Sequence, residues 1–93
     1  MAMTADRAEI VALGALGWLA EAELLDAFQS TTGADQTAIR AAAGDPDFLG
    51  AVLDFVLMDD AWVQGVCQAQ SLPYDALLQA RAALPGGDLP HWT

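Results

Sequence analysis

The feature that most constrains the fold is a helix-start signal followed at once by an apolar run. Asp45-Pro46-Asp47 supplies a capping carboxylate, a proline at the first helical position and an acid in the first turn. Each of these satisfies or complements the free N–H groups at a helix N-terminus. The run Phe48–Leu57 is apolar on nearly every side, which is typical of a helix at the centre of a domain. We therefore expect the remaining segments to pack around residues 46–58.

Composition predicts that those segments are helical too. Apolar residues make up 55% of the 93 residues, and alanine and leucine dominate over β-branched types. A chain of this length has no room for two cores. The sequence therefore predicts an all-α fold, a compact orthogonal bundle of five to six short helices. We expect a single domain over residues 1–86 and a C-terminal tail over 87–93.

Capping and turn residues predict the helix boundaries. Asp6 and Glu9 form a capping box that predicts a first helix ending near Ala20. Further boundaries are expected at the end of the second helix (Gly33), the start and end of the third (Asp35, Gly44), the start of the fifth (Asp59) and the start of the sixth (Pro73).

The two halves of the chain also resemble each other. Setting Ile10 against Leu49 aligns Leu13 with Val52 and, much later, Ile39 with Leu78. Two units are too few for a solenoid, which usually needs three or more. The pattern predicts a pseudo-repeat of two three-helix halves within one bundle.

Charge narrows the possible partners. Thirteen acids against three basic residues give a net charge of −10. Nucleic acids and anionic membrane surfaces would repel such a chain, and a cationic protein surface would attract it. The charge is also explained by solubility alone. The apolar run Ile10–Ala20 is too short to cross a bilayer, and Asp6 and Glu9 argue against a secretion signal around it.

The residues that could carry chemistry have simpler explanations. Four clustered acids lie at helix starts and Asp54 lies on a helix face expected to meet solvent, so no calcium loop or buried carboxylate pair is predicted (Asp45, Asp47, Asp59, Asp60). Cys67 has no basic neighbour in sequence, and with His91 it cannot form a zinc site. We therefore predict no catalytic, cofactor-binding or metal-binding residue, and a cytoplasmic location.

Two patterns point to binding instead. Gly33 and Ile39 have the spacing of a helix-turn-helix, but Asp35, Gln36, Thr37 and Arg40 give its second helix little with which to read DNA.

Gly14 and Gly17 should allow another helix to come close to the first helix. We expect that helix to be the central one, with a partner helix as the alternative. Candidate interface residues are Gly14, Gly17, Trp18, Trp62 and Trp92.

Three segments together are similar to a known bacterial family, domain-of-unknown-function family 3572, found mainly in alphaproteobacteria. They are Gly44–Phe55, Thr32–Asp35 with Ile39–Ala41, and Ala80–Gly86. The resemblance covers about Asp6 to Gly86 and implies a helical, cytoplasmic bacterial protein with no assigned catalytic residue. Relatives carry Asp-Pro before the third and sixth helices, where this chain has Asp35-Gln36 and Leu72-Pro73.

The interpretation favoured by these observations is a non-enzymatic module that binds another protein or a second copy of itself. A helix-turn-helix-derived nucleic-acid binder is the first alternative, and a small enzyme or enzyme subunit is the second.

Overall fold

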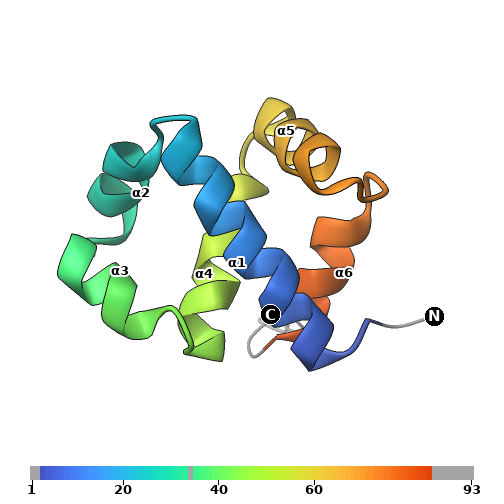
Figure 1. Cartoon of the computed structure of the whole chain (residues 1–93), viewed down its shortest axis with the longest axis horizontal. Helices are drawn as coiled ribbons and strands as arrows, with labels where there is room; N and C mark the ends of the chain where they lie inside the picture. The colour runs from blue at the N-terminus through green and yellow to red at the C-terminus, as the bar shows by residue number, and fades with distance from the viewer. Residues whose placement is uncertain (1–2, 34, 85–93) are drawn as a thin grey trace, which may run out of the picture.

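A computed structural model describes residues 3–33 and 35–84. Within these residues the chain forms six helices and no strand, which confirms the all-α bundle (Figure 1). The helices are α1 (Ala5–Glu21), α2 (Leu25–Thr32), α3 (Gln36–Ala42), α4 (Pro46–Val56), α5 (Asp60–Gln70) and α6 (Ala76–Ala83). The predicted tail lies outside the described residues.

Three aspartates cap helices as predicted. The side chains of Asp35, Asp45 and Asp59 accept hydrogen bonds of 2.8, 3.0 and 2.9 Å from backbone N–H groups of the first turns of α3, α4 and α5. These carboxylates satisfy donors that have no partner within the helix. Their positions at helix starts are therefore explained by capping.

Two predicted helix starts were wrong. Thr4, not Asp6, caps α1, because Thr4 has extended backbone angles and its Oγ1 accepts from the Arg7 N–H at 3.2 Å. Asp6 lies inside the first turn, where its charge complements the helix dipole. The last helix begins at Ala76 rather than Pro73, because the chain first makes a turn in which the Ala76 N–H donates to the Pro73 carbonyl at 3.0 Å.

The predicted ends of the first two helices, near Ala20 and at Gly33, are both confirmed. Gly33 ends α2 in the left-handed conformation expected of glycine, with a φ of 78°. After α1 the same conformation falls on Glu23, with a φ of 62°, and the Leu24 N–H donates to the Leu19 carbonyl at 2.8 Å. Glutamate carries no turn signal, so the end of α1 at Glu21 is not marked by a glycine or a proline as the end of α2 is.

The core is built on α4 and α1 together. As predicted, α4 is a central helix, because its apolar side chains are almost completely buried (Leu49, Val52, Leu53, Phe55 and Val56). Against it α1 places a stripe of mostly small residues, which lets the two helices come close (Ala8, Val11, Ala12, Ala15 and Leu19). In Figure 1, α1 runs diagonally in front of α4, and it also packs against α5 and α6.

The predicted pairing of the two halves fails at the residue level. Ile10 is 59% exposed whereas Leu49 is fully buried, and Ile39 is buried whereas Leu78 is 61% exposed. The buried stripe of α1 instead matches α4 in a shifted register, with Ala8 at the position of Leu49. Ile10 therefore does not take part in the core.

A single aromatic side chain carries much of the attachment of α2 and α3 to the rest. These two helices stand further from the α1, α4, α5 and α6 group than the members of that group stand from one another (Figure 1). Phe28 of α2 is fully buried and places its ring edge-to-face against Phe48 and Phe55, with centroid distances of 5.8 and 5.3 Å. Ile39 adds a second buried contact from α3.

Candidate interaction surface

The acid considered for catalysis is part of an exposed ion pair. Arg81 Nε lies 2.6 Å from Asp54 Oδ1, and Arg81 Nη2 donates to Asp54 Oδ2 at 3.1 Å. The Asp54 side chain is 58% exposed, as its helix face predicted. Arg81 lies in the last turn of α6, where its charge also complements the helix dipole. The sequence did not predict that its guanidinium lies across Gly50, where a Cβ would come within 2.8 Å of Nη1.

Cys67 is held as a buried thiol. Burial raises its pKa, and the nearby charge of Asp75 raises it further. It borders an open depression of about 340 Å³ whose other lining side chains are uncharged (Gln64, Gln68, Ser71, Leu72 and Tyr74). This depression offers no group to activate the sulfur. Among the described residues no three side chains of His, Cys, Asp and Glu are grouped as metal ligands would be.

Tyr74 ties the turn before α6 to the first turn of α5, because its hydroxyl donates to Asp60. This hydrogen bond favours the protonated phenol and raises the pKa of Tyr74 above its ordinary value of 10.0. Partial burial and the charge of Asp60 act in the same direction.

Tyr74 therefore gives a measurable pH dependence. It is the one tyrosine in the sequence, so phenolate absorbance reports this hydroxyl alone. We expect its titration midpoint above pH 10.0, and Asp60→Asn should move the midpoint back toward that value. Because the folded-state pKa is raised, the stabilising contribution is present below the unfolded-state pKa and is lost as pH rises through the folded-state pKa. A wild-type midpoint at or below 10.0 would contradict the contact.

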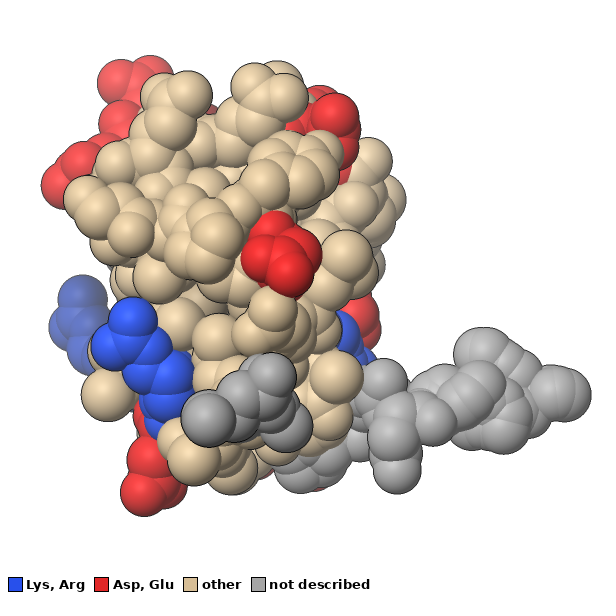
Figure 2. Space-filling model, turned by 90° about the vertical axis from the view of Figure 1, so that its right-hand side faces the viewer, with Lys and Arg blue, Asp and Glu red and all other residues tan. Residues whose placement is uncertain are grey.

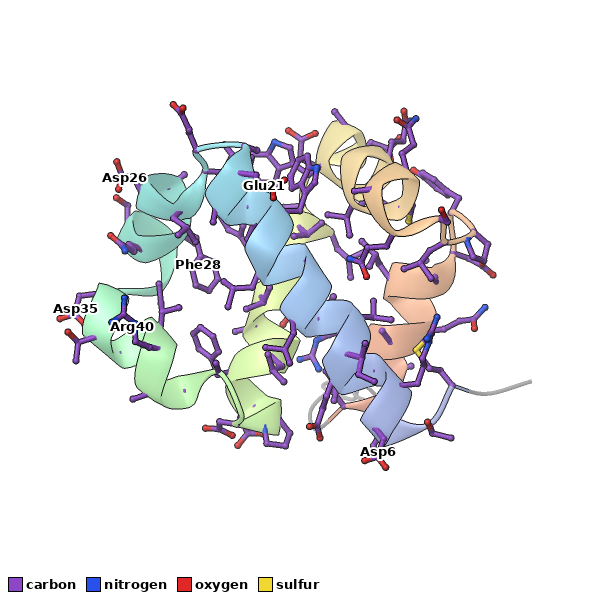
Figure 3. All side chains as sticks on the ribbon, in the orientation of Figure 1. Asp6, Glu21, Asp26, Phe28, Asp35 and Arg40 are labelled. Carbon is purple, nitrogen blue, oxygen red and sulfur yellow. The ribbon has the colours of Figure 1, made fainter. Side chains whose placement is uncertain are left out.

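The helix-turn-helix spacing corresponds to two helices joined by a short turn at Gly33. Ile39 is buried, and Arg40 projects from α3 on the outer side of the molecule (Figure 3). Asp26 and Asp35 line a shallow depression of about 320 Å³ beside the turn. The turn is thus present, but acids surround it where a DNA-binding surface would need cations.

The two glycines of α1 behave differently from the prediction. The α4 helix is not what approaches Gly14. The side chain of Gln70, from α5, occupies the space that a Cβ at Gly14 would need. The Nε2 of Gln70 is buried there without a hydrogen-bond partner in the described part of the chain. Gly17 has nothing within 4 Å of the corresponding position. Gly14 is therefore explained by packing inside the chain, and Gly17 is not.

The tryptophans proposed for an interface also pack within the chain. The Trp18 ring lies against Gly65 of α5, so α1 and α5 each present a glycine to a long side chain of the other. Trp62 stacks on Phe55 with a centroid distance of 4.9 Å. Both indoles are half-buried, and Trp92 lies outside the described residues. Neither described tryptophan is a freely exposed anchor.

On the outer face of α1, only Gly17 was among the predicted interface residues. Ile10 is 59% exposed and Leu13 is 44% exposed, and Gly17 and Ala20 are exposed on the same face. Steps of three and four residues separate them, which is the spacing of a helix-pairing seam. We call Ile10, Leu13, Gly17 and Ala20 the outer seam. In Figure 1 no other helix lies in front of α1.

A second candidate surface, apart from the outer seam, lies on the side of the molecule formed by α5 and α6. Figure 2 looks onto the side of α5 and α6 and shows a mostly uncharged middle with one acidic side chain in it, while the other charged residues lie toward the margins of the view. Tyr74 and Leu78 contribute exposed rings and methyl groups from the α6 region, with exposures of 51% and 61%. These residues do not form a single helical stripe, which makes the outer seam the better-defined surface.

Comparison with known proteins assigns the chain to a family. Residues 5–87 match the model of a family described as Protein of unknown function (DUF3572). The chain belongs to this family. The match begins at the first residue of α1 and runs past the end of α6, so it includes the whole described bundle. No curated protein and no solved structure matches the chain. In the described part of this family member, no helix has both the length and the apolarity needed to cross a bilayer.

Proposed function

We propose that this chain is a non-enzymatic interaction module whose outer seam binds a helix of another protein. The observation that carries the proposal is that α1 has apolar residues on two opposite faces. One face is fully buried in the core, and the opposite face leaves Ile10 and Leu13 in solvent at the spacing used by paired helices. Apolar residues arranged in this way are suited to a second helix rather than to water.

Gly17 supports the same proposal. A glycine inside a helix costs about 1 kcal/mol relative to alanine. The described structure offers no compensating contact at Gly17, in contrast to Gly14, Gly50 and Gly65, which each receive a side chain from another helix. A partner helix whose backbone comes close to α1 would account for it.

Replacement of Ile10 and Leu13 together by glutamine should abolish partner binding without unfolding the chain. Glutamine keeps helix propensity and adds no charge, so the variant loses mainly exposed apolar surface. Affinity capture from the native host, followed by mass spectrometry, would compare it with wild type. The matched control is Met58→Gln with Leu78→Gln, two residues that are 71% and 61% exposed elsewhere on the chain.

The informative result is a set of proteins that wild type and the control retain and the α1 double variant loses. Recovery of the same proteins by all three would remove the outer seam from the proposal. Urea unfolding of the double variant, expected within about 0.5 kcal/mol of wild type, separates loss of binding from loss of folding.

A cytoplasmic location in a bacterial, alphaproteobacterial host is part of the proposal. The free thiol of Cys67 supports a reducing compartment. The absence of turnover chemistry is also proposed, on the support of the raised pKa of Cys67 and the solvent-exposed ion pair of Asp54.

A further inference from the structure

We infer that the helix bound by the outer seam belongs to a different protein and carries lysine or arginine beyond both ends of its apolar stripe. This inference rests on the proposed function and names the chemistry of its partner. It starts from the residues that continue the seam in each direction. Asp6 lies four residues before Ile10, and Glu21 lies four residues after Gly17, so both acids share the face of the seam.

Both acids are exposed, and Figure 3 shows them at opposite ends of α1. The apolar stretch between them, from Ile10 to Ala20, is about 15 Å long at the rise of an α-helix. A partner helix of roughly three turns would cover it. Its residues just beyond the stripe would then stand opposite Asp6 and Glu21.

The other charged groups near α1 leave the charge around the outer seam negative. Arg7 is exposed beside Asp6 in the first turn, and Glu9 is half-buried on the same helix. Glu23 follows the end of α1 and is exposed. The elements packed beside α1 contribute the neutral Gln70 at Gly14. On α1 and in the residues just after it, four acids therefore stand against one arginine, and Arg81 of the neighbouring α6 is paired with Asp54. The whole chain adds a net charge of −10.

Charge also argues against a second copy as the occupant. If two α1 helices paired in parallel, Asp6 would face Asp6 and Glu21 would face Glu21. If they paired antiparallel, Asp6 would face Glu21. Both arrangements place like charges opposite each other and bring together two chains of −10 each. A partner with basic ends converts the same positions into attractive pairs.

The test is a selection from a displayed library of three-turn amphipathic helices against the full chain. Seam positions vary among apolar residues, and the positions beyond both ends vary among lysine, glutamine and glutamate. Counter-selection against the Ile10→Gln, Leu13→Gln variant keeps the peptides that depend on the outer seam. We expect lysine to be enriched at both ends, with affinity falling about tenfold when those lysines are changed to glutamate.

A variant of the chain tests the same pairing from the other side. Asp6→Asn with Glu21→Gln should weaken the selected lysine-flanked peptides by about tenfold and leave glutamine-flanked peptides of the same stripe unchanged. Light scattering of the full chain alone should give one copy of 9.7 kDa.

The outcomes separate the two claims. Seam-dependent peptides with no preference for lysine would overturn the inference and leave the interaction module standing. A stable dimer disrupted by Ile10→Gln, Leu13→Gln would overturn it in favour of a second copy. Failure to recover any seam-dependent peptide would contradict the proposed function itself.

Discussion

Replacing Phe28 by alanine should lower the free energy of unfolding by about 3–5 kcal/mol, because it leaves a cavity among Phe48, Phe55 and the core. Domains of this size are stabilised by about 5–15 kcal/mol in total. The substitution should therefore remove a large part of the chain's stability. Urea denaturation followed by circular dichroism measures the change.

Leu78→Ala is the control, since Leu78 is 61% exposed and should change stability by about 0.5 kcal/mol or less. A loss below about 1 kcal/mol for Phe28→Ala would show that α2 and α3 are held mainly by other contacts. A large loss in both variants would instead indicate that Leu78 is covered in solution.

Gly65→Ala should destabilise the chain by about 1–2 kcal/mol, although alanine is the better helix former. The added methyl group would occupy the position of the Trp18 ring, and a rigid indole cannot move aside as cheaply as the tip of a glutamine can. Urea unfolding measures the cost, and tryptophan fluorescence reports displacement of the ring.

The explanation requires coupling between the two residues. In a Trp18→Ala background the steric conflict is gone, so Gly65→Ala should become neutral or stabilising. If Gly65→Ala costs the same in both backgrounds, the conflict lies elsewhere than with Trp18.

The features of the fold that are encoded locally could be predicted from sequence. Asp35, Asp45 and Asp59 cap helices through bonds to residues two or three positions away, and Gly33 ends a helix through its own backbone angle. The buried face of α4 followed from its own apolar pattern. Thr4 was missed as the cap of α1 because Asp6 and Glu9 nearby carried a stronger local signal.

Features that depend on contacts distant in sequence could not be predicted. Local sequence does not indicate that Gln70 reaches Gly14, that Trp18 covers Gly65, or that Arg81 crosses Gly50 to Asp54. Ile10 and Leu13 were not among the predicted interface residues for a related reason. Because α1 has apolar residues on two faces, its own sequence does not show which face is covered, and only the packing of α4, α5 and α6 decides this.

Gly17→Ala tests most directly whether the outer face of α1 is kept open for a partner. With nothing within 4 Å of the new methyl group, the substitution should raise the free energy of unfolding by up to about 1 kcal/mol. The same methyl group should hold a partner helix away and weaken the seam-dependent peptides by about tenfold or more. A variant that is more stable and binds more weakly is the predicted result. A variant that is more stable and binds those peptides as tightly as wild type would contradict the account.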